Sequence, residues 1–74
     1  MNELLQTVIN ITDGISSDNL LLFKMDENIG TIRNVIIDGK KQKFIYNQNH
    51  RSLLIIDLIK TEGTLFVDYY EPTI

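Results

Sequence analysis

Alanine, the residue with the highest helix propensity, does not occur in this chain. Isoleucine occurs twelve times, and valine, tyrosine and phenylalanine, which also favour strands, occur three times each. A chain of this composition is expected to build most of its structure from β-sheet. Four isolated glycines, at positions 14, 30, 39 and 63, stand between the expected strands as turn residues.

The strongest local signal is the Asp38-Gly39 pair, which stands between two apolar runs. Both central residues of a type I′ turn need positive φ, which Asp and Gly tolerate, so the pair predicts a two-residue hairpin. Its flanking strands are expected at 31–37 and 41–46. Further strands are expected at 20–25, 53–59 and 64–70, with a helix beginning after Ser52 as the alternative for 53–59.

Residues 3–12 are the one good helix candidate, and we assign residues 1–14 to an N-terminal helix. Asn2 can cap its start, and Gly14 stands where a left-handed residue would end it. A strand is the rival, because apolar and β-branched residues also alternate in this segment. The residues at helical spacing are Leu4, Leu5, Val8, Ile9 and Thr12, and the alternating ones are Leu5, Thr7, Ile9 and Ile11.

A second two-residue turn at residues 62–63 would fix the pairing register of the last two expected strands. Leu58 then faces Val67, Ile56 faces Tyr69, and one face of the strand pair is wholly apolar. The opposite face is also rich in apolar residues, so we expect this pair to be central in the sheet. The apolar face comprises Leu54, Ile56, Leu58, Leu65, Val67 and Tyr69, and the opposite face comprises Leu53, Ile55, Asp57, Ile59, Phe66, Asp68 and Tyr70.

These elements predict an α+β, mostly β fold: an N-terminal helix followed by an antiparallel meander of about five strands, forming a small barrel or curled sheet. Residues 1–74 are expected to form a single small domain, with the helix at 1–14 and the sheet at 20–70. So short a chain buries little surface, and small domains are often stabilised by disulfides, metal ions or a partner subunit. With no cysteine and one histidine, this chain has only the partner subunit as a plausible source of that stability. We therefore expect a homo-oligomer.

Neither a signal peptide nor a membrane span is expected. The first twelve residues contain Glu3 and no basic residue, and no apolar run is longer than the four residues of Leu53 to Ile56, far fewer than a span requires. We expect a soluble, cytoplasmic protein. The alanine-free text, rich in Ile and Asn, is typical of AT-rich genomes such as those of some Gram-positive bacteria and their phages.

Basic residues are concentrated in one segment. Residues 40–51 carry four positive charges and no acid, whereas the remaining residues sum to −7. Lysines beside Phe44 and Tyr46 are typical of surfaces that bind single-stranded nucleic acid. Strand alternation, however, separates rings from lysines, which favours lysines that only keep a sheet edge soluble. The candidate anion contacts are Lys40, Lys41, Lys43 and Arg51.

No set of residues indicates catalysis. Asp57 and Asp68 face each other in the predicted register and are a candidate pair for a hard cation, but charged neighbours are more often structural. His50 and Ser52 lie on one short loop, which cannot assemble a nucleophile, a base and an acid. The glycines belong to no phosphate-binding run. We expect no catalytic, cofactor-binding or metal-binding residue, and no enzyme.

The leading hypothesis is a non-enzymatic protein-interaction module, such as an adaptor, regulator or inhibitor, encoded by a phage or mobile element. It would act through a sheet face or edge, because a strand pair that is apolar on both sides leaves a face for a partner. The alternative is a small-barrel nucleic-acid-binding protein that uses residues 40–51. The candidate protein contacts are Leu53, Ile55, Ile59, Phe66 and Tyr70.

Overall fold

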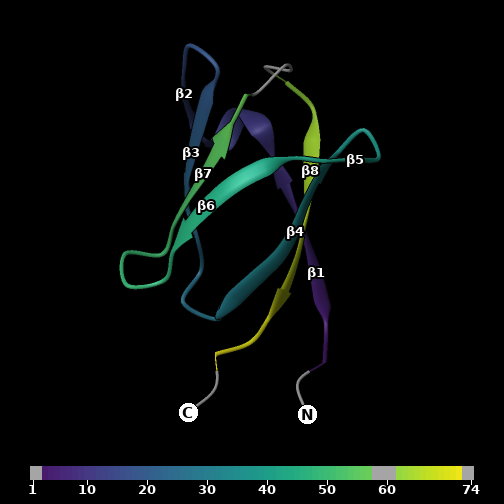
Figure 1. Cartoon of the computed structure of the whole chain (residues 1–74), viewed down its shortest axis with the longest axis vertical. Helices are drawn as coiled ribbons and strands as arrows, with labels where there is room; N and C mark the ends of the chain where they lie inside the picture. Colours follow the sequence, from purple (N-terminus) through teal and green to yellow (C-terminus); the bar gives the residue numbers. More distant parts are fainter. Residues whose placement is uncertain (1–2, 58–61, 73–74) are drawn as a thin grey trace.

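The computed structural model describes residues 3–57 and 62–72. These residues form two four-stranded antiparallel sheets that pack face to face (Figure 1). The strand order is β1-β8-β4-β5 in sheet A and β2-β3-β7-β6 in sheet B. The strands are β1 (Leu5–Asn10), β2 (Ile15–Ser17), β3 (Leu20–Lys24), β4 (Thr31–Ile37), β5 (Lys40–Lys41), β6 (Lys43–Asn47), β7 (Ser52–Ile56) and β8 (Thr64–Tyr70), and a 3₁₀ turn, η1 (Ile11–Asp13), follows β1.

The predicted N-terminal helix is wrong, because the described part of residues 1–14 forms β1 and η1. All six residues of β1 pair with β8, which lies near the other end of the chain. Burial alternates along β1, with Leu5, Thr7 and Ile9 on the more buried side. The strand rival was therefore correct: pairing with β8 supplies the backbone hydrogen bonds and overrides the local helical spacing.

Gly14 is needed for a close approach and not for a left-handed helix end. Its φ of −95° and ψ of 176° are extended. A Cβ at this position would lie 2.8 Å from Cε1 of Phe23 and 2.9 Å from the carbonyl oxygen of Leu22. Only glycine therefore lets the chain pass this closely against β3 as it moves from sheet A to sheet B.

The two-residue hairpin predicted at 38–39 is confirmed. Ile37 pairs with Lys40 across it, and both central residues have positive φ, 53° and 77°. The returning strand is divided, since β5 belongs to sheet A and β6 to sheet B. Between them the backbone N–H of Gln42 donates to the carbonyl oxygen of Val35 at 2.7 Å. One continuous segment thus passes from sheet A to sheet B, from β5 at the right of Figure 1 to β6 at the left.

The predicted last hairpin is also wrong. β7 lies between β3 and β6 in sheet B, whereas β8 lies between β1 and β4 in sheet A. Ile56 consequently faces Lys43, and Tyr69 pairs with Leu5 and Ile32. Leu58, the centre of the predicted register, lies outside the described residues. β7 and β8 are consecutive in the sequence but lie in different sheets, so the fold is neither a meander nor a barrel but an open all-β sandwich.

The core comes from the inward side of both sheets. A register shift in β4 next to Arg33 lets Ile32 and Val35, three residues apart, both point inward. No polar or charged side chain is buried among the described residues, and none of them forms a helix that could cross a membrane. The buried residues are Ile11, Leu21, Phe23, Met25, Ile29, Ile32, Val35, Ile37, Leu53, Ile55, Leu65 and Val67.

Candidate interaction surfaces

The outer side of sheet B carries a continuous group of aliphatic side chains, which we call the aliphatic face. One row crosses all four strands, because Ile15 pairs with Leu22, Leu22 with Leu54, and Leu54 with Ile45. Burial alternates in β3 and β7, so these residues point away from the core. Ile15 and Ile45 are 73% and 57% exposed. The aliphatic face comprises Ile15, Leu20, Leu22, Ile45, Leu54 and Ile56.

Polar groups border this face without interrupting it. Lys43, which pairs with Ile56, lies 3.9 Å from a carboxylate oxygen of Asp57. At the other end of the face, Nζ of Lys24 donates to the carbonyl oxygen of His50 at 2.6 Å. Within the face itself every side chain is Ile or Leu, so the face offers no side-chain hydrogen-bonding group to water.

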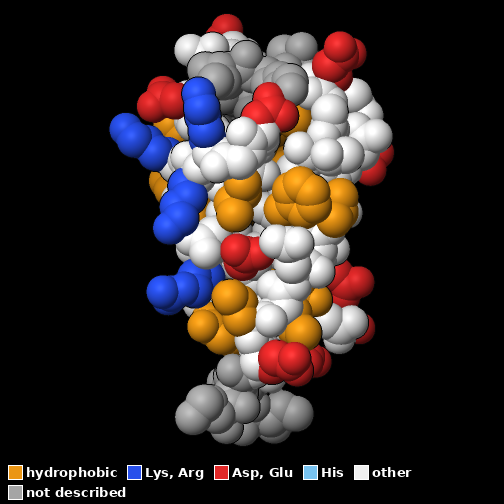
Figure 2. All heavy atoms as spheres, turned by 90° about the vertical axis from the view of Figure 1, so that its right-hand side faces the viewer, with side chains coloured by type: hydrophobic (Ala, Val, Ile, Leu, Met, Phe, Trp, Pro, Cys, Tyr) orange, Lys and Arg blue, Asp and Glu red, His pale blue; other side chains and the backbone are white. Residues whose placement is uncertain are grey.

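The outer side of sheet A has a different composition (Figure 2). Its apolar side chains lie in more than one group, separated by acidic and other polar side chains (Figure 2). In one of these groups, Val8 and Ile36 both pair with Phe66. In the next row, the carboxylate of Asp68 accepts hydrogen bonds from the amide of Gln6 at 2.8 Å and from that of Asn34 at 3.2 Å. A hydrogen-bonded polar row therefore adjoins this apolar group.

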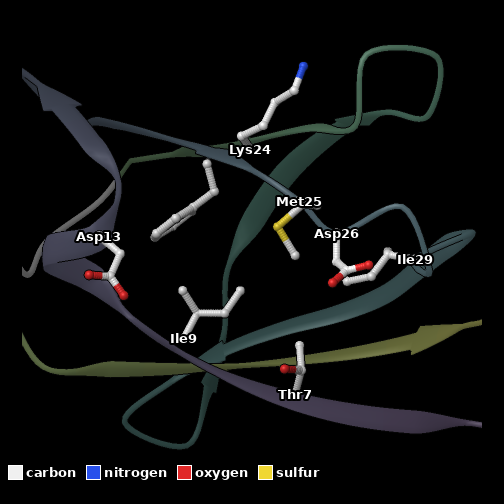
Figure 3. A pocket seen from close by; sticks show the side chains of 8 residues that line it. Thr7, Ile9, Asp13, Lys24, Met25, Asp26 and Ile29 are labelled. Carbon is white, nitrogen blue, oxygen red and sulfur yellow. The ribbon is translucent and has the colours of Figure 1, made fainter.

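A pocket of about 340 Å³ lies beside β1, between the two sheets (Figure 3). Ile9 and Met25 point into its centre, and Asp13 and Asp26 lie at opposite ends, while the side chain of Lys24 is directed away. The pocket thus has an apolar interior and an acidic rim. Its lining residues are Thr7, Ile9, Asp13, Phe23, Lys24, Met25, Asp26 and Ile29.

The five predicted protein contacts do not form one surface. Leu53 and Ile55 are fully buried between the sheets, which corrects the outward orientation that the predicted hairpin gave them. Phe66 and Tyr70 belong to β8 in sheet A, where Phe66 is 37% exposed, and Ile59 lies outside the described residues. A contact role for Phe66 and Tyr70 stays a prediction.

The predicted anion contacts are divided between the two sheets. Lys40 and Lys41 form β5 at the edge of sheet A, and Lys43 begins β6 in sheet B. Arg51 lies in the turn after β6, 3.9 Å from a carboxylate oxygen of Glu27. Phe44 and Tyr46 pack against the core, as the alternation predicted, so they are not stacking partners beside the lysines. Nucleic-acid binding through these four residues stays a prediction.

No catalytic geometry appears around the other sequence candidates. Asp68 lies on β8 of sheet A, whereas Asp57 follows the end of β7 in sheet B, and the two do not pair. No group of three His, Cys, Asp or Glu among residues 3–57 and 62–72 could hold a metal ion. Burial raises the pKa of Tyr46 above 10.0, with the nearby charge of Arg51 acting in the opposite direction. Its hydroxyl donates to the carbonyl oxygen of Ile29 at 3.2 Å, which is a structural role.

Sequence reasoning missed the aliphatic face because it placed Leu54 and Ile56 in the core. Residues 20–23 are four apolar residues in succession, so an outward Leu20 or Leu22 is apolar like its inward neighbours and the sequence does not distinguish the two sides. Comparison of the chain with protein-family models, with curated proteins and with solved structures finds no match.

Proposed function

We propose that this protein is a non-enzymatic protein-interaction module that works as a homodimer, with the aliphatic faces of two copies packed together. The observation that carries the proposal is the aliphatic face itself: six Ile and Leu side chains, contiguous over four strands, on the outside of a small domain. Contiguous apolar surface of this kind is rare on monomeric proteins and marks interaction sites.

The composition of the face supports a second copy as its occupant. Interfaces between separately stable proteins use aromatic and Arg anchors, whereas obligate homodimer interfaces resemble a hydrophobic core cut in half. The aliphatic face contains no aromatic residue and no Arg, and it consists of Ile and Leu, the residue types of Leu21, Leu53 and Ile55 in the core on the other side of the same sheet. Two such faces would form a third apolar layer between the sandwiches.

The size of the face is sufficient for a small dimer. Four strands spaced about 4.8 Å apart cover a width of about 19 Å; at a rise of about 3.4 Å per residue, their length is about 10 Å in the three-residue β2 and about 17 Å in the five-residue β3, β6 and β7. Because side chains corrugate this surface, packing would remove roughly 500 Å² of accessible area per copy, or roughly 1,000 Å² in total. That total is near the lower limit for a specific interface.

Light scattering after size exclusion tests the proposal with two matched variants. Ile45→Lys places a charge on the aliphatic face, and Val8→Lys places the same charge on the outer side of sheet A; both residues lie on edge strands, with exposures of 57% and 56%. We expect twice the 8.6 kDa chain mass for the wild type and for Val8→Lys, and a monomer for Ile45→Lys. A wild type that stays monomeric at about 1 mM, where even weak association is populated, would refute the proposal.

A further inference from the structure

Strand β1 presents an open edge that lacks the usual protection. Its sequence, LQTVIN, contains no charge and no proline, its pairing with β8 runs without a bulge, and no other described strand pairs with it. The other edges are blunted: β5 is two lysines, β2 has only three residues, and β6 begins with Lys43. Long, neutral edges are the ones to which another strand can be added.

The alternation of the ladder shows which backbone groups of β1 are free. The N–H of Ile11 donates to the carbonyl oxygen of Gly63 at 2.8 Å, continuing the register in which Ile9 pairs with Leu65. In an antiparallel pair, hydrogen-bonded positions occur at every second residue, so the odd-numbered residues of β1 bond to β8. The N–H and C=O groups of Gln6, Val8 and Asn10 therefore face the open edge.

The pocket lies on the inward side of this edge. Thr7 and Ile9 of β1 line it together with Phe23, Met25 and Ile29, and these residues give it an apolar interior. The two carboxylates at its ends are both exposed (Figure 3). Because Lys24 donates to the loop before β7, its ammonium group is held away and does not neutralise the carboxylates inside the pocket.

We propose that β1 binds an extended peptide of a partner protein by strand addition, and that the pocket takes a Lys or Arg side chain of that peptide. Alternate side chains of an added strand point inward and outward, so one would enter the pocket while its neighbours lie beside Val8. The aliphatic stem of Lys or Arg would contact Ile9 and Met25, and its charge would reach Asp13 or Asp26.

Charge distinguishes this occupant from the others. A second copy of β1 offers no basic side chain, so self-pairing would leave both carboxylates without a counter-charge. A nucleic acid would bring phosphates toward Asp13 and Asp26, which is repulsive. A basic extended peptide satisfies the free backbone groups and the acidic rim together.

A direct test uses the labelled peptide Thr-Val-Lys-Val-Thr-Val and its counterpart with Glu in place of Lys. By fluorescence anisotropy we expect the Lys peptide to bind roughly tenfold more tightly, because attraction at the acidic rim replaces repulsion. Replacing both carboxylates, Asp13→Asn with Asp26→Asn, should abolish most of this preference while leaving binding itself. Equal affinity of the wild type for both peptides would overturn the side-chain part of the inference.

Val8→Pro tests the strand part. The N–H of Val8 faces the open edge, so proline removes no bond to β8 but blocks one that the peptide needs. Circular dichroism and thermal melting should show an intact fold, and affinity for the Lys peptide should fall about tenfold. In the wild type, the peptide should slow amide hydrogen exchange at Gln6, Val8 and Asn10 but not at Thr7 or Ile9. Unchanged affinity in a folded Val8→Pro variant, or protection without this alternation, would contradict strand addition.

The inference goes beyond the proposed homodimer and uses a different surface. Light scattering reports on the aliphatic face of sheet B, whereas anisotropy reports on the edge of sheet A, so failure of one is distinguishable from failure of the other. If Val8→Pro dissociated the dimer, copies would be pairing through β1, and both proposals would be refuted together.

Discussion

The two outer faces of the sandwich have a similar arrangement of strands but differ in the polarity of the side chains that they expose to water. Both present side chains from four strands, and each has a row of apolar residues. On sheet A that row adjoins Asp68, which is held between two side-chain amides. On sheet B the adjoining row adds Leu20 and Ile56. The outside of sheet A therefore offers hydrogen-bonding groups to solvent, whereas the outside of sheet B resembles an uncovered core.

The largest expected effect on stability is at β7, where two neighbouring residues point to opposite sides of sheet B. Leu53 is fully buried and Leu54 belongs to the aliphatic face. Leu53→Ala should lower the free energy of unfolding by about 2–5 kcal/mol, through lost burial and a cavity. Leu54→Ala should cost less, and its cost should grow with protein concentration because it acts on the dimer. Urea denaturation at two protein concentrations measures both; a larger, concentration-independent loss at Leu54 would reverse the assignment of the faces.

The second effect concerns the polar row of sheet A. Asp68→Ala removes the acceptor of two amides, one of them on the half-buried Asn34, and should cost about 1–2 kcal/mol. Asp68→Asn is the matched control, because it keeps one acceptor and should lose less than half as much. Thermal melting of both variants at one protein concentration would show the difference. Equal stability of Asp68→Ala and the wild type would show that the polar row does not stabilise the outer side of sheet A.

The third effect lies where the two sheets meet, at Tyr46. Tyr46→Phe removes the hydrogen bond to Ile29 and should cost about 1 kcal/mol at neutral pH. Burial raises the pKa of Tyr46 in the folded state, so the unfolded chain loses this proton first as the pH rises. The associated stability is complete below about pH 10 and is lost above it. Urea denaturation from pH 7 to pH 11 should therefore show a steeper decline for the wild type than for Tyr46→Phe.

Some strands of the two sheets could be predicted from the sequence, and others could not. The strands at 31–37 and 64–70 and the turn at 38–39 were predicted with the bounds that the structure shows, because alternation and turn chemistry are local signals. The first strand was missed because its residues satisfy helical and strand spacing equally. Its pairing partner, β8, lies more than fifty residues away, and no local pattern reports on that distance.

The candidate surface was missed for a related reason. Residues 53–56 are four Leu and Ile in succession, so their inward and outward sides cannot be told apart by composition. Assuming a hairpin between consecutive strands then placed Leu54 in the core and Leu53 outside, the reverse of the structure. A segment that is apolar on both sides did indicate an apolar surface outside the core, but only the sheet order shows which side is exposed.

The smallest effect is expected at Lys43, at the border of the aliphatic face. Its ion pair with Asp57 is 3.9 Å long and largely exposed, so Lys43→Gln should change the stability of the fold by less than about 0.5 kcal/mol. The same variant separates two uses of sheet B. If the lysines bind nucleic acid, anisotropy with a labelled oligonucleotide at about 10 mM salt, where screening is weak, should show binding that Lys43→Gln diminishes. If sheet B serves as a dimer face, the oligonucleotide should not bind, and Lys43→Gln should strengthen the dimer slightly, because removing the charge lowers the desolvation cost beside Ile56.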